Sequence, residues 1–409
     1  MVTYRSMQRP IAITGVGVVS PLGSSAGAFH SALLRGDSGV GTVTAFDVSG
    51  CRATRAASVA DFDAAQWIPP MKMRRMDHTS RFAVVVVRQA LEAAGYPLAV
   101  DGDDGAGVVM GTYTAGGQHT TEYLAALHAG GATGAPALLF NSTVANAPAS
   151  LAALECKLRG PNITVSVKEA SGLSAIVTAT DLLRLGRASA IVAGGVDALF
   201  DIFYRVHDRF GVFGPSERSP APFDRRHDGF VLGEGGYALL LEDAEACQAR
   251  GARPLGHIVG VGAASSSQPI NRWPDAPEAI VRTMRAALAD AAVDAAEIGA
   301  VYGAANGAPS LDDVEAQALL EVFVGAQPLV TSIKGAIGES AAASAASCVA
   351  AILCGNRVPA LCGLEQPAPS THGLRLVSAP TTIAAPHVMV NGIASGGAIF
   401  SVVMRIGEG

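Results

Sequence analysis

Short runs of apolar, often β-branched residues alternate along the whole chain with stretches of helical periodicity, and this alternation constrains the fold most. It is typical of an α/β protein whose sheets are largely parallel. The pattern predicts strands over residues 11–19, 107–111, 163–167, 190–196, 237–242, 254–263, 300–303, 387–393 and 398–405. It predicts helices over residues 80–94, 171–185, 277–292, 312–323 and 340–353.

A break near residues 250–254 divides the chain into two parts, 1–252 and 253–409. Each part starts with a β-branched strand that is followed by a turn rich in Gly and Ser and by a helix. Repetition of one order of elements indicates an internal structural repeat. We therefore expect two similar α/β halves fused in one chain.

Composition excludes several classes of protein. Hydrophobic residues make up 49% and charged residues 16% of the 409 residues, and the mean hydropathy is +0.33. These values exclude a disordered chain and favour one that hides surface against a partner. The formal charge of −6 gives no basic patch, so we expect neither a nucleic-acid nor a membrane partner.

The apolar run at residues 11–19 could be taken for a short signal peptide. Pro10 precedes this run, Gly15 and Gly17 interrupt it, and Pro21 closes it, so a buried first strand is the better interpretation. The stretch 340–353 is well short of a membrane span. We expect a cytoplasmic protein.

Several other motifs do not indicate a functional site. The segment GVGVVS at residues 15–20 lacks the third Gly of a dinucleotide fingerprint, and GSSAG at 23–27 sits in a loop, where turn and N-cap serines explain it better than a nucleophile elbow. The histidines show no ligand spacing. We expect no cofactor and no metal, and reduced thiols at the six cysteines, which are Cys51, Cys156, Cys247, Cys348, Cys354 and Cys362.

A corner at residues 168–172 is the most informative local feature. A β-branched strand runs into a tight turn, and a helix of about fifteen residues begins directly behind it. Backbone N–H groups and the helix dipole favour an anion at such a corner, which is where an enzyme would place a nucleophilic thiolate. The residue at this corner is Glu169.

Four segments resemble the β-ketoacyl synthase family, whose members have the thiolase fold. IAITGVGVVSPLG at 11–23 is similar to the family's opening strand and loop, and PFDRRHDGFVLGEG at 222–235 to its long central signature. AGGVDA at 193–198 resembles its strand ending in Gly-Gly. NGIASGG at 391–397 resembles its closing Gly-rich loop with the aromatic residues replaced. The resemblance implies two α/β halves stacked as a five-layer αβαβα arrangement.

Working members of that family carry a Cys, which holds the acyl chain as a thioester, and two His, which stabilise the enolate formed when malonyl is decarboxylated. The motifs place Glu169 at the Cys position, Asn306 at the first His position and Glu339 at the second. The lysine of the family's second His motif is retained as Lys334. A carboxylate is a poor acyl carrier, and Glu339 puts negative charge where negative charge must develop. The resemblance therefore implies no catalytic residue for condensation.

This pattern is similar to that of chain length factors, the non-condensing partners of type II polyketide ketosynthases. The resemblance implies a heterodimer with an active, Cys-containing ketosynthase that accepts malonyl units from an acyl carrier protein. Three alternatives stay open: a stand-alone acyl-processing enzyme using paired carboxylates, a decarboxylase of malonyl-carrier protein, and a homodimeric scaffold that does no chemistry.

We expect Glu169, Glu339 and Lys334 to share a small pocket, next to Lys168. Two carboxylates, a cation and a helix N-terminus make a neutralised structural network, which we prefer to paired carboxylates doing acid/base work.

In the resembling family the growing chain extends into a tunnel at the subunit interface, gated by a helix after a Gly-Gly turn. Matching that pattern puts the gate at Gln118, Thr121 and Ala125. Side chains of this size would leave room for a longer or straighter product, such as a polyene or a highly reduced chain. A plain amphipathic interface helix explains the same segment.

Overall fold

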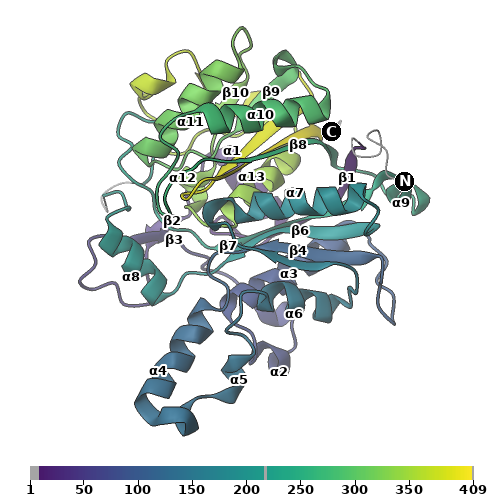
Figure 1. The fold of residues 1–409 in the computed structure, drawn as a ribbon, viewed down its shortest axis with the longest axis vertical. Helices are drawn as coiled ribbons and strands as arrows, with labels where there is room; N and C mark the ends of the chain where they lie inside the picture. The colour runs from purple at the N-terminus through teal and green to yellow at the C-terminus, as the bar shows by residue number, and fades with distance from the viewer. Residues whose placement is uncertain (1–8, 216–218, 408–409) are drawn as a thin grey trace.

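The computed structural model describes residues 9–215 and 219–407, and one large mixed sheet organises them (Figure 1). Its strand order is β12-β10-β9-β14-β15-β8-β1-β7-β6-β4-β5. The strands are β1 (Ile11–Val19), β4 (Ala106–Gly111), β5 (Asn162–Val165), β6 (Ala190–Asp197), β7 (Gly235–Asp243), β8 (Gly256–Ser265), β9 (Ile298–Tyr302), β10 (Leu329–Thr331), β12 (Arg375–Leu376), β14 (His387–Ile393) and β15 (Ala398–Ile406).

The sheet consists of two halves that repeat one strand order. The N-terminal half reads β5-β4-β6-β7-β1, and the C-terminal half reads β10-β9-β14-β15-β8 with β12 added at its edge. The two halves join where Ile11–Ile13 of β1 pair antiparallel with residues 256–258 of β8. Equal strand order agrees with the expected internal repeat, whereas the boundary at residue 252 stays a prediction.

Helices complete the five layers. Helices α7 (Ser171–Arg184) and α13 (Ala343–Cys354) pack against each other and contact strands of both half-sheets, so they form the middle layer. Helices α3 (His78–Ala93) and α6 (Ala147–Cys156) cover the outer face of the N-terminal half-sheet. Helix α10 (Glu278–Ala291) and its neighbour α11 (Pro309–Val322) form the outer layer of the C-terminal half. The predicted thiolase-like five-layer fold is confirmed.

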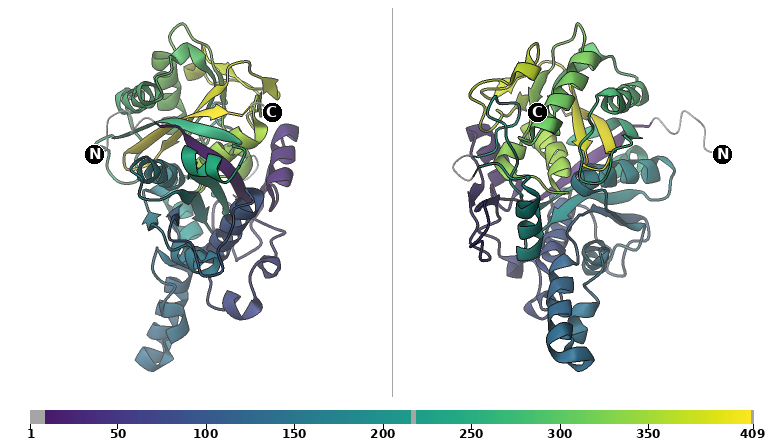
Figure 2. Two further views of the ribbon diagram at one scale, coloured as in Figure 1. Left: turned by 90° about the vertical axis from the view of Figure 1, so that its right-hand side faces the viewer. Right: turned by 60° about the vertical axis from the view of Figure 1, so that its left-hand side comes forward.

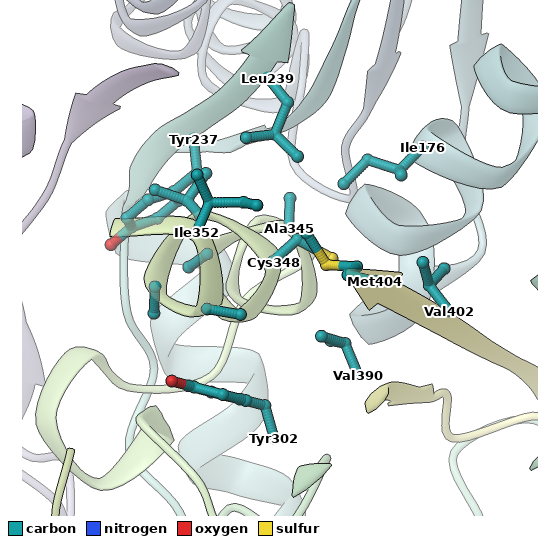
Figure 3. Close-up of a cluster of buried hydrophobic side chains, with 14 of the residues drawn as sticks. Ile176, Tyr237, Leu239, Tyr302, Ala345, Cys348, Ile352, Val390, Val402 and Met404 are labelled. Carbon is teal, nitrogen blue, oxygen red and sulfur yellow. The ribbon is translucent and has the colours of Figure 1, made fainter. Parts of the chain in front are cut away.

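The largest hydrophobic core lies around the middle layer (Figure 3). Cys348 of α13 is fully buried there among apolar side chains from α7 and from both half-sheets, including Ile176, Leu239, Val390 and Met404. Small residues allow close contact between the helices of this layer. As a result, the N–H of Gly172 at the start of α7 donates to the carbonyl of Ala341 at 2.9 Å. The middle layer thereby fixes the start of α7 and the corner before it.

The other elements lie outside these five layers of sheet and helix. Helices α4 (Gly117–Gly134) and α5 (Ala137–Phe140) form an arm that projects from the N-terminal half (Figures 1 and 2). The remaining helices are α1 (Ala26–Arg35), α2 (Pro70–Met73), α8 (Asp201–Phe210), α9 (Ala244–Ala249) and α12 (Lys334–Ile337). Two small sheets pair β2 (Val40–Thr42) with β3 (Arg55–Ala57), and β11 (Arg357–Val358) with β13 (Thr381–Thr382). Within the described residues, no helix is long and apolar enough to cross a bilayer.

The predicted strands at residues 11–19 and 387–393 match β1 and β14, and the other predicted elements differ from the observed ones by up to three residues at an end. Several elements were not predicted, among them helices α1, α6 and α8 and strand β10. Ser25 is the N-cap of α1, where its hydroxyl accepts a hydrogen bond from the N–H of Ala28. The N-cap interpretation of the serines at 23–27 is therefore confirmed.

Candidate functional site

The corner before α7 places Glu169 at a helix N-terminus inside the molecule. Strand β5 ends at Val165, Lys168 adopts a positive φ of 55°, and α7 begins at Ser171. The Ser171 hydroxyl closes the turn, because it accepts from the N–H of Val167 and donates to the carbonyl of Lys168. Glu169 is 7% exposed. The carboxylate therefore lies at the positive end of a buried helix, as the corner motif predicts.

A turn between β14 and β15 holds the Glu169 carboxylate. The backbone N–H of Ser395 donates to Oε2 at 3.0 Å, and the Ser395 hydroxyl donates to Oε1 at 2.9 Å. Lys168 Nζ in turn lies 2.6 Å from Ser395 Oγ and 2.6 Å from Oδ1 of Asn271, and 5.7 Å from the centre of the Tyr113 ring. We call Glu169, Ser395, Lys168 and Asn271 the outer cluster.

A second cluster lies deeper. Glu339 Oε2 accepts hydrogen bonds from Asn306 Nδ2 at 2.7 Å and from Lys334 Nζ at 2.8 Å, and all three residues are at most 2% exposed. The pKa of Glu339 is raised to about 7, chiefly because burial penalises the charged carboxylate. Lys334 and Asn306 oppose this rise, and the nearby Glu169 carboxylate contributes to it. We call Asn306, Lys334 and Glu339 the inner cluster.

The sequence placed Glu169, Glu339 and Lys334 in one network, and the structure corrects this point. Lys334 Nζ contacts Glu339, whereas the Glu169 carboxylate accepts its hydrogen bonds from Ser395. The two carboxylates still line one closed cavity of about 10 Å³, which has room for at most about one water molecule. The two carboxylates are therefore neighbours in space with different hydrogen-bond partners, and the charge of Glu169 still acts on Glu339.

Buried carboxylates that the sequence analysis missed hold the loop around Asn306. Asp312 accepts from the N–H groups of Asn306 and Gly307, and it also contacts His227 Nδ1 at 3.2 Å. The side chain of Glu315 accepts from the backbone of the preceding residues 304 and 305. Asp312 in the first turn of α11, followed three residues later by Glu315, was a detectable signal, since acidic residues near a helix start accept from free N–H groups.

The outer cluster opens on a groove of about 410 Å³, and Lys168, Glu169, Asn271 and Ser395 all line it. Its apolar wall is a stripe on α8, formed by Ile202, Val206 and Phe210 at intervals of four residues. The inner residues Asn306 and Lys334 do not line this groove. An organic ligand in the groove would therefore meet the outer cluster first.

The expected gate residues divide between two environments. Gln118 and Thr121 line a further groove of about 780 Å³, together with Phe200 and Ile202. Ala125 lies one turn farther along α4, is exposed, and is not among the residues of this groove. Whether any of the three lines a product tunnel stays a prediction. Within residues 9–215 and 219–407, no group of three or more His, Cys, Asp and Glu is arranged to hold a metal ion.

Comparison with known families agrees with this fold. Residues 8–246 match the "Beta-ketoacyl synthase, N-terminal domain" family, and residues 255–357 match the "Beta-ketoacyl synthase, C-terminal domain" family. These matches cover well over half of the chain. The protein therefore belongs to the β-ketoacyl synthase family.

The individual relatives include a 3-oxoacyl-[acyl-carrier-protein] synthase and a polyketide synthase subunit. The chain is 31% identical over 91% of its length to the tetracenomycin polyketide synthase ketoacyl synthase beta subunit of Streptomyces glaucescens, and covers 92% of that protein. It is 29% identical over 88% of its length to 3-oxoacyl-[acyl-carrier-protein] synthase 2 of Coxiella burnetii, of which it covers 89%.

Among solved structures, the ishigamide ketosynthase/chain length factor superposes with a TM-score of 0.91 at 27% identity, over 98% of this chain and 100% of that one. A β-ketoacyl synthase from Burkholderia phymatum STM815 gives the same values. Both likenesses span the whole described fold. The chain is thus similar in structure to a ketosynthase/chain length factor and to a β-ketoacyl synthase.

Proposed function

We propose that this protein is a non-condensing chain length factor subunit, which pairs with an active ketosynthase and shapes the tunnel for the polyketide. The observation that carries the proposal is the buried Glu169 at the corner where the family holds its acyl chain on a cysteine. Two hydrogen bonds from Ser395 hold that carboxylate in place.

The other chemistry of the site also disfavours condensation. Glu339 occupies a position where the family's reaction develops negative charge, and its own carboxyl ionises there near neutral pH because burial raises its pKa to about 7. None of the six cysteines lines the two cavities around Glu169, as far as the described residues go. Burial also raises the pKa of the Cys156 and Cys354 thiols, to about 11 and about 12, which leaves little thiolate.

A partner surface of suitable character lies on the N-terminal half. Strand β5 ends the large sheet and pairs with β4 alone among the described strands, so its outer edge can accept another strand. Thr164 on β5 has a buried hydroxyl without a hydrogen-bond partner in the described chain. The arm exposes the large apolar side chains of Leu124, Leu138 and Phe140, and Val144 just after the arm is exposed too, as expected of an interface with a partner.

Co-expression with a Cys-containing ketosynthase and an acyl carrier protein tests the proposal. We expect a 1:1 complex on size exclusion with mass measurement, and condensation of malonyl units from the carrier protein. Activity should survive Glu169→Ala in this chain and be lost when the partner's cysteine is replaced. A self-sufficient homodimer that condenses or decarboxylates acyl substrates would overturn the proposal.

A second experiment tests the control of chain length. Thr121→Phe adds bulk in the 780 Å³ groove and should shorten the product, because less room is left for the growing chain. Ala125→Phe is the matched control, since Ala125 is exposed beyond the groove, and it should change the length less. An unchanged length distribution with Thr121→Phe would refute the gate. Because the gate side chains are small, we propose that the product is a polyene or a highly reduced chain.

A further inference from the structure

The outer cluster contains a serine hydroxyl in contact with both a cation and a carboxylate. Ser395 Oγ donates to Glu169 Oε1 at 2.9 Å and accepts from Lys168 Nζ at 2.6 Å. The hydroxyl has one proton, and the carboxylate is in position to accept it. A hydroxyl with a base on one side and a cation on the other is the arrangement of an activated nucleophile.

The backbone holds these groups in unusual conformations. Lys168 and Asn271 have φ values of 55° and 68°, in the left-handed region that non-glycine residues rarely adopt. Lys168 Nζ nevertheless joins Asn271 to Ser395 across three separate segments of the chain. Gly396, with φ of 116°, bonds the Ser395 turn to the loop of Asn271 through its N–H and the carbonyl of Arg272. Such conformations persist where the surrounding structure enforces them, often at functional sites.

The cluster also has space in front of it. Ser395, Lys168 and Glu169 line the groove of about 410 Å³ whose wall is the apolar stripe of α8. Phe203 and Trp273 add aromatic surface to the same groove. An aliphatic or polyene chain would lie against this wall with its carbonyl carbon near the polar end. A purely structural serine would not require an adjoining groove.

We propose that Ser395 is the nucleophile of an acyl-transfer site for acyl thioesters, with Glu169 as its general base. Ser395 Oγ forms a bond to the carbonyl carbon while its proton passes to Glu169. The carbon–sulfur bond then breaks, Glu169 returns the proton to the leaving thiolate, and an ester remains on Ser395. Lys168 has three N–H donors, of which two contact Ser395 and Asn271, and the third is available to the oxyanion.

Water completes the cycle. Glu169 takes a proton from a water molecule that attacks the ester, and the proton goes to Ser395 Oγ as the carbon–oxygen bond breaks. The sum is hydrolysis of a thioester to a carboxylic acid and a thiol, with no oxidant or reductant. This reaction goes beyond the proposed function, because it forms no carbon–carbon bond and does not require the partner's cysteine.

A fluorophosphonate probe tests for the activated serine on the unmodified protein. The chain is labelled alone and in complex with its ketosynthase, and the labelled residue is identified by peptide mass spectrometry. We expect the label on Ser395, and none on that peptide in Ser395→Ala. The label is read on this chain's own peptide in both samples, so failure to pair and failure to react are separate results. Absence of label at Ser395 would overturn the inference.

Turnover of hexanoyl-N-acetylcysteamine provides the second readout. Glu169→Gln keeps the size of the side chain but removes the base, and should slow thiol release by about 100- to 10,000-fold. Ser395→Cys should still form the acyl adduct, seen as an added hexanoyl mass. The control is Ser265→Ala, because Ser265 lies opposite Ala398 in the neighbouring strand and its exposed hydroxyl donates to the carbonyl of Ser266. Equal rates in Ser395→Ala and in the unmodified chain would refute the site.

Discussion

The outer and inner clusters both contain a glutamate near a lysine, but their surroundings differ. Glu339 and Lys334 are in direct contact at 2.8 Å, and both are almost completely buried. Glu169 instead accepts from Ser395, and its neighbour Lys168 is half-buried beside a groove. The inner pair has no access to bulk water that could solvate a charge left alone, whereas the outer groups do.

This difference teaches that identical residue types acquire different roles from burial. Desolvation penalises the charged form of Glu339 strongly enough to raise its pKa to about 7 despite the adjacent lysine. Burial also lowers the pKa of Lys168, and the adjacent Glu169 opposes that shift. The inner cluster is suited to a structural role, and the outer cluster to contact with a ligand.

Removal of the inner lysine should have the largest effect. Lys334→Met leaves Glu339 buried without its cation, so we expect a loss of about 3–5 kcal/mol in unfolding free energy at pH 8. Urea denaturation followed by circular dichroism measures this loss. Lys334→Met combined with Glu339→Gln removes both charges and keeps an acceptor for Asn306, so it should recover most of the stability. A loss below about 1 kcal/mol in the single variant would contradict a sealed inner cluster.

The second-largest effect should be a pH dependence of the unfolding free energy that comes from the inner cluster. A carboxyl whose pKa is higher in the folded than in the unfolded protein stabilises most when protonated. The contribution of Glu339 is thus present below about pH 4.5 and is lost as the pH rises through about 7, a fall of up to about 3 kcal/mol. Urea titrations at intervals between pH 4.5 and 8 measure this fall.

The double variant Lys334→Met with Glu339→Gln should lose most of this decrease in unfolding free energy between pH 4.5 and 8. A smaller slope should remain above pH 6.5, because Asp312 raises the pKa of His227, whose stabilising contribution is lost as the pH rises through the folded value. If the double variant kept the full fall, Glu339 would not be its source.

Removal of the outer lysine should have the smallest effect on stability. Lys168→Met breaks hydrogen bonds to Ser395 and Asn271 beside water, and such hydrogen bonds contribute about 1 kcal/mol net. The same urea measurement should therefore separate Lys168→Met from Lys334→Met by several-fold. Equal losses in the two variants would remove the distinction between the clusters.

Much of the fold could be predicted from local pattern. The ends of β1 and β14 were predicted from continuous apolar runs, because strands buried on both faces contain few polar interruptions. The corner at Glu169 was also detectable, since a β-branched strand, a tight turn and a helix follow one another within a few residues. The three-residue β10 was missed, because its identity as a strand depends on β9 and β12 on either side.

The partners of the site residues could not be predicted in the same way. Ser395 lies 226 residues from Glu169, and nothing in its own segment indicates a carboxylate as its partner. Lys334 and Glu339 are five residues apart, so their pairing was closer to local pattern. Division of the expected network into two clusters follows from contacts between the halves.

By itself, the sequence determined the alternation of elements and predicted two similar halves, and its resemblance to the family predicts a glutamate, an asparagine and a glutamate at the three catalytic positions. These features depend on side-chain type and short-range spacing, which are local properties of the chain. Only the tertiary structure decided that Ser395 contacts Glu169 and that Lys334 is buried in contact with Glu339. It also decided that the groove of about 410 Å³ is lined by Ser395 and Glu169 but not by Lys334 and Glu339. The reason is that burial and long-range contact exist only after the half-sheets have packed on their shared helical layer.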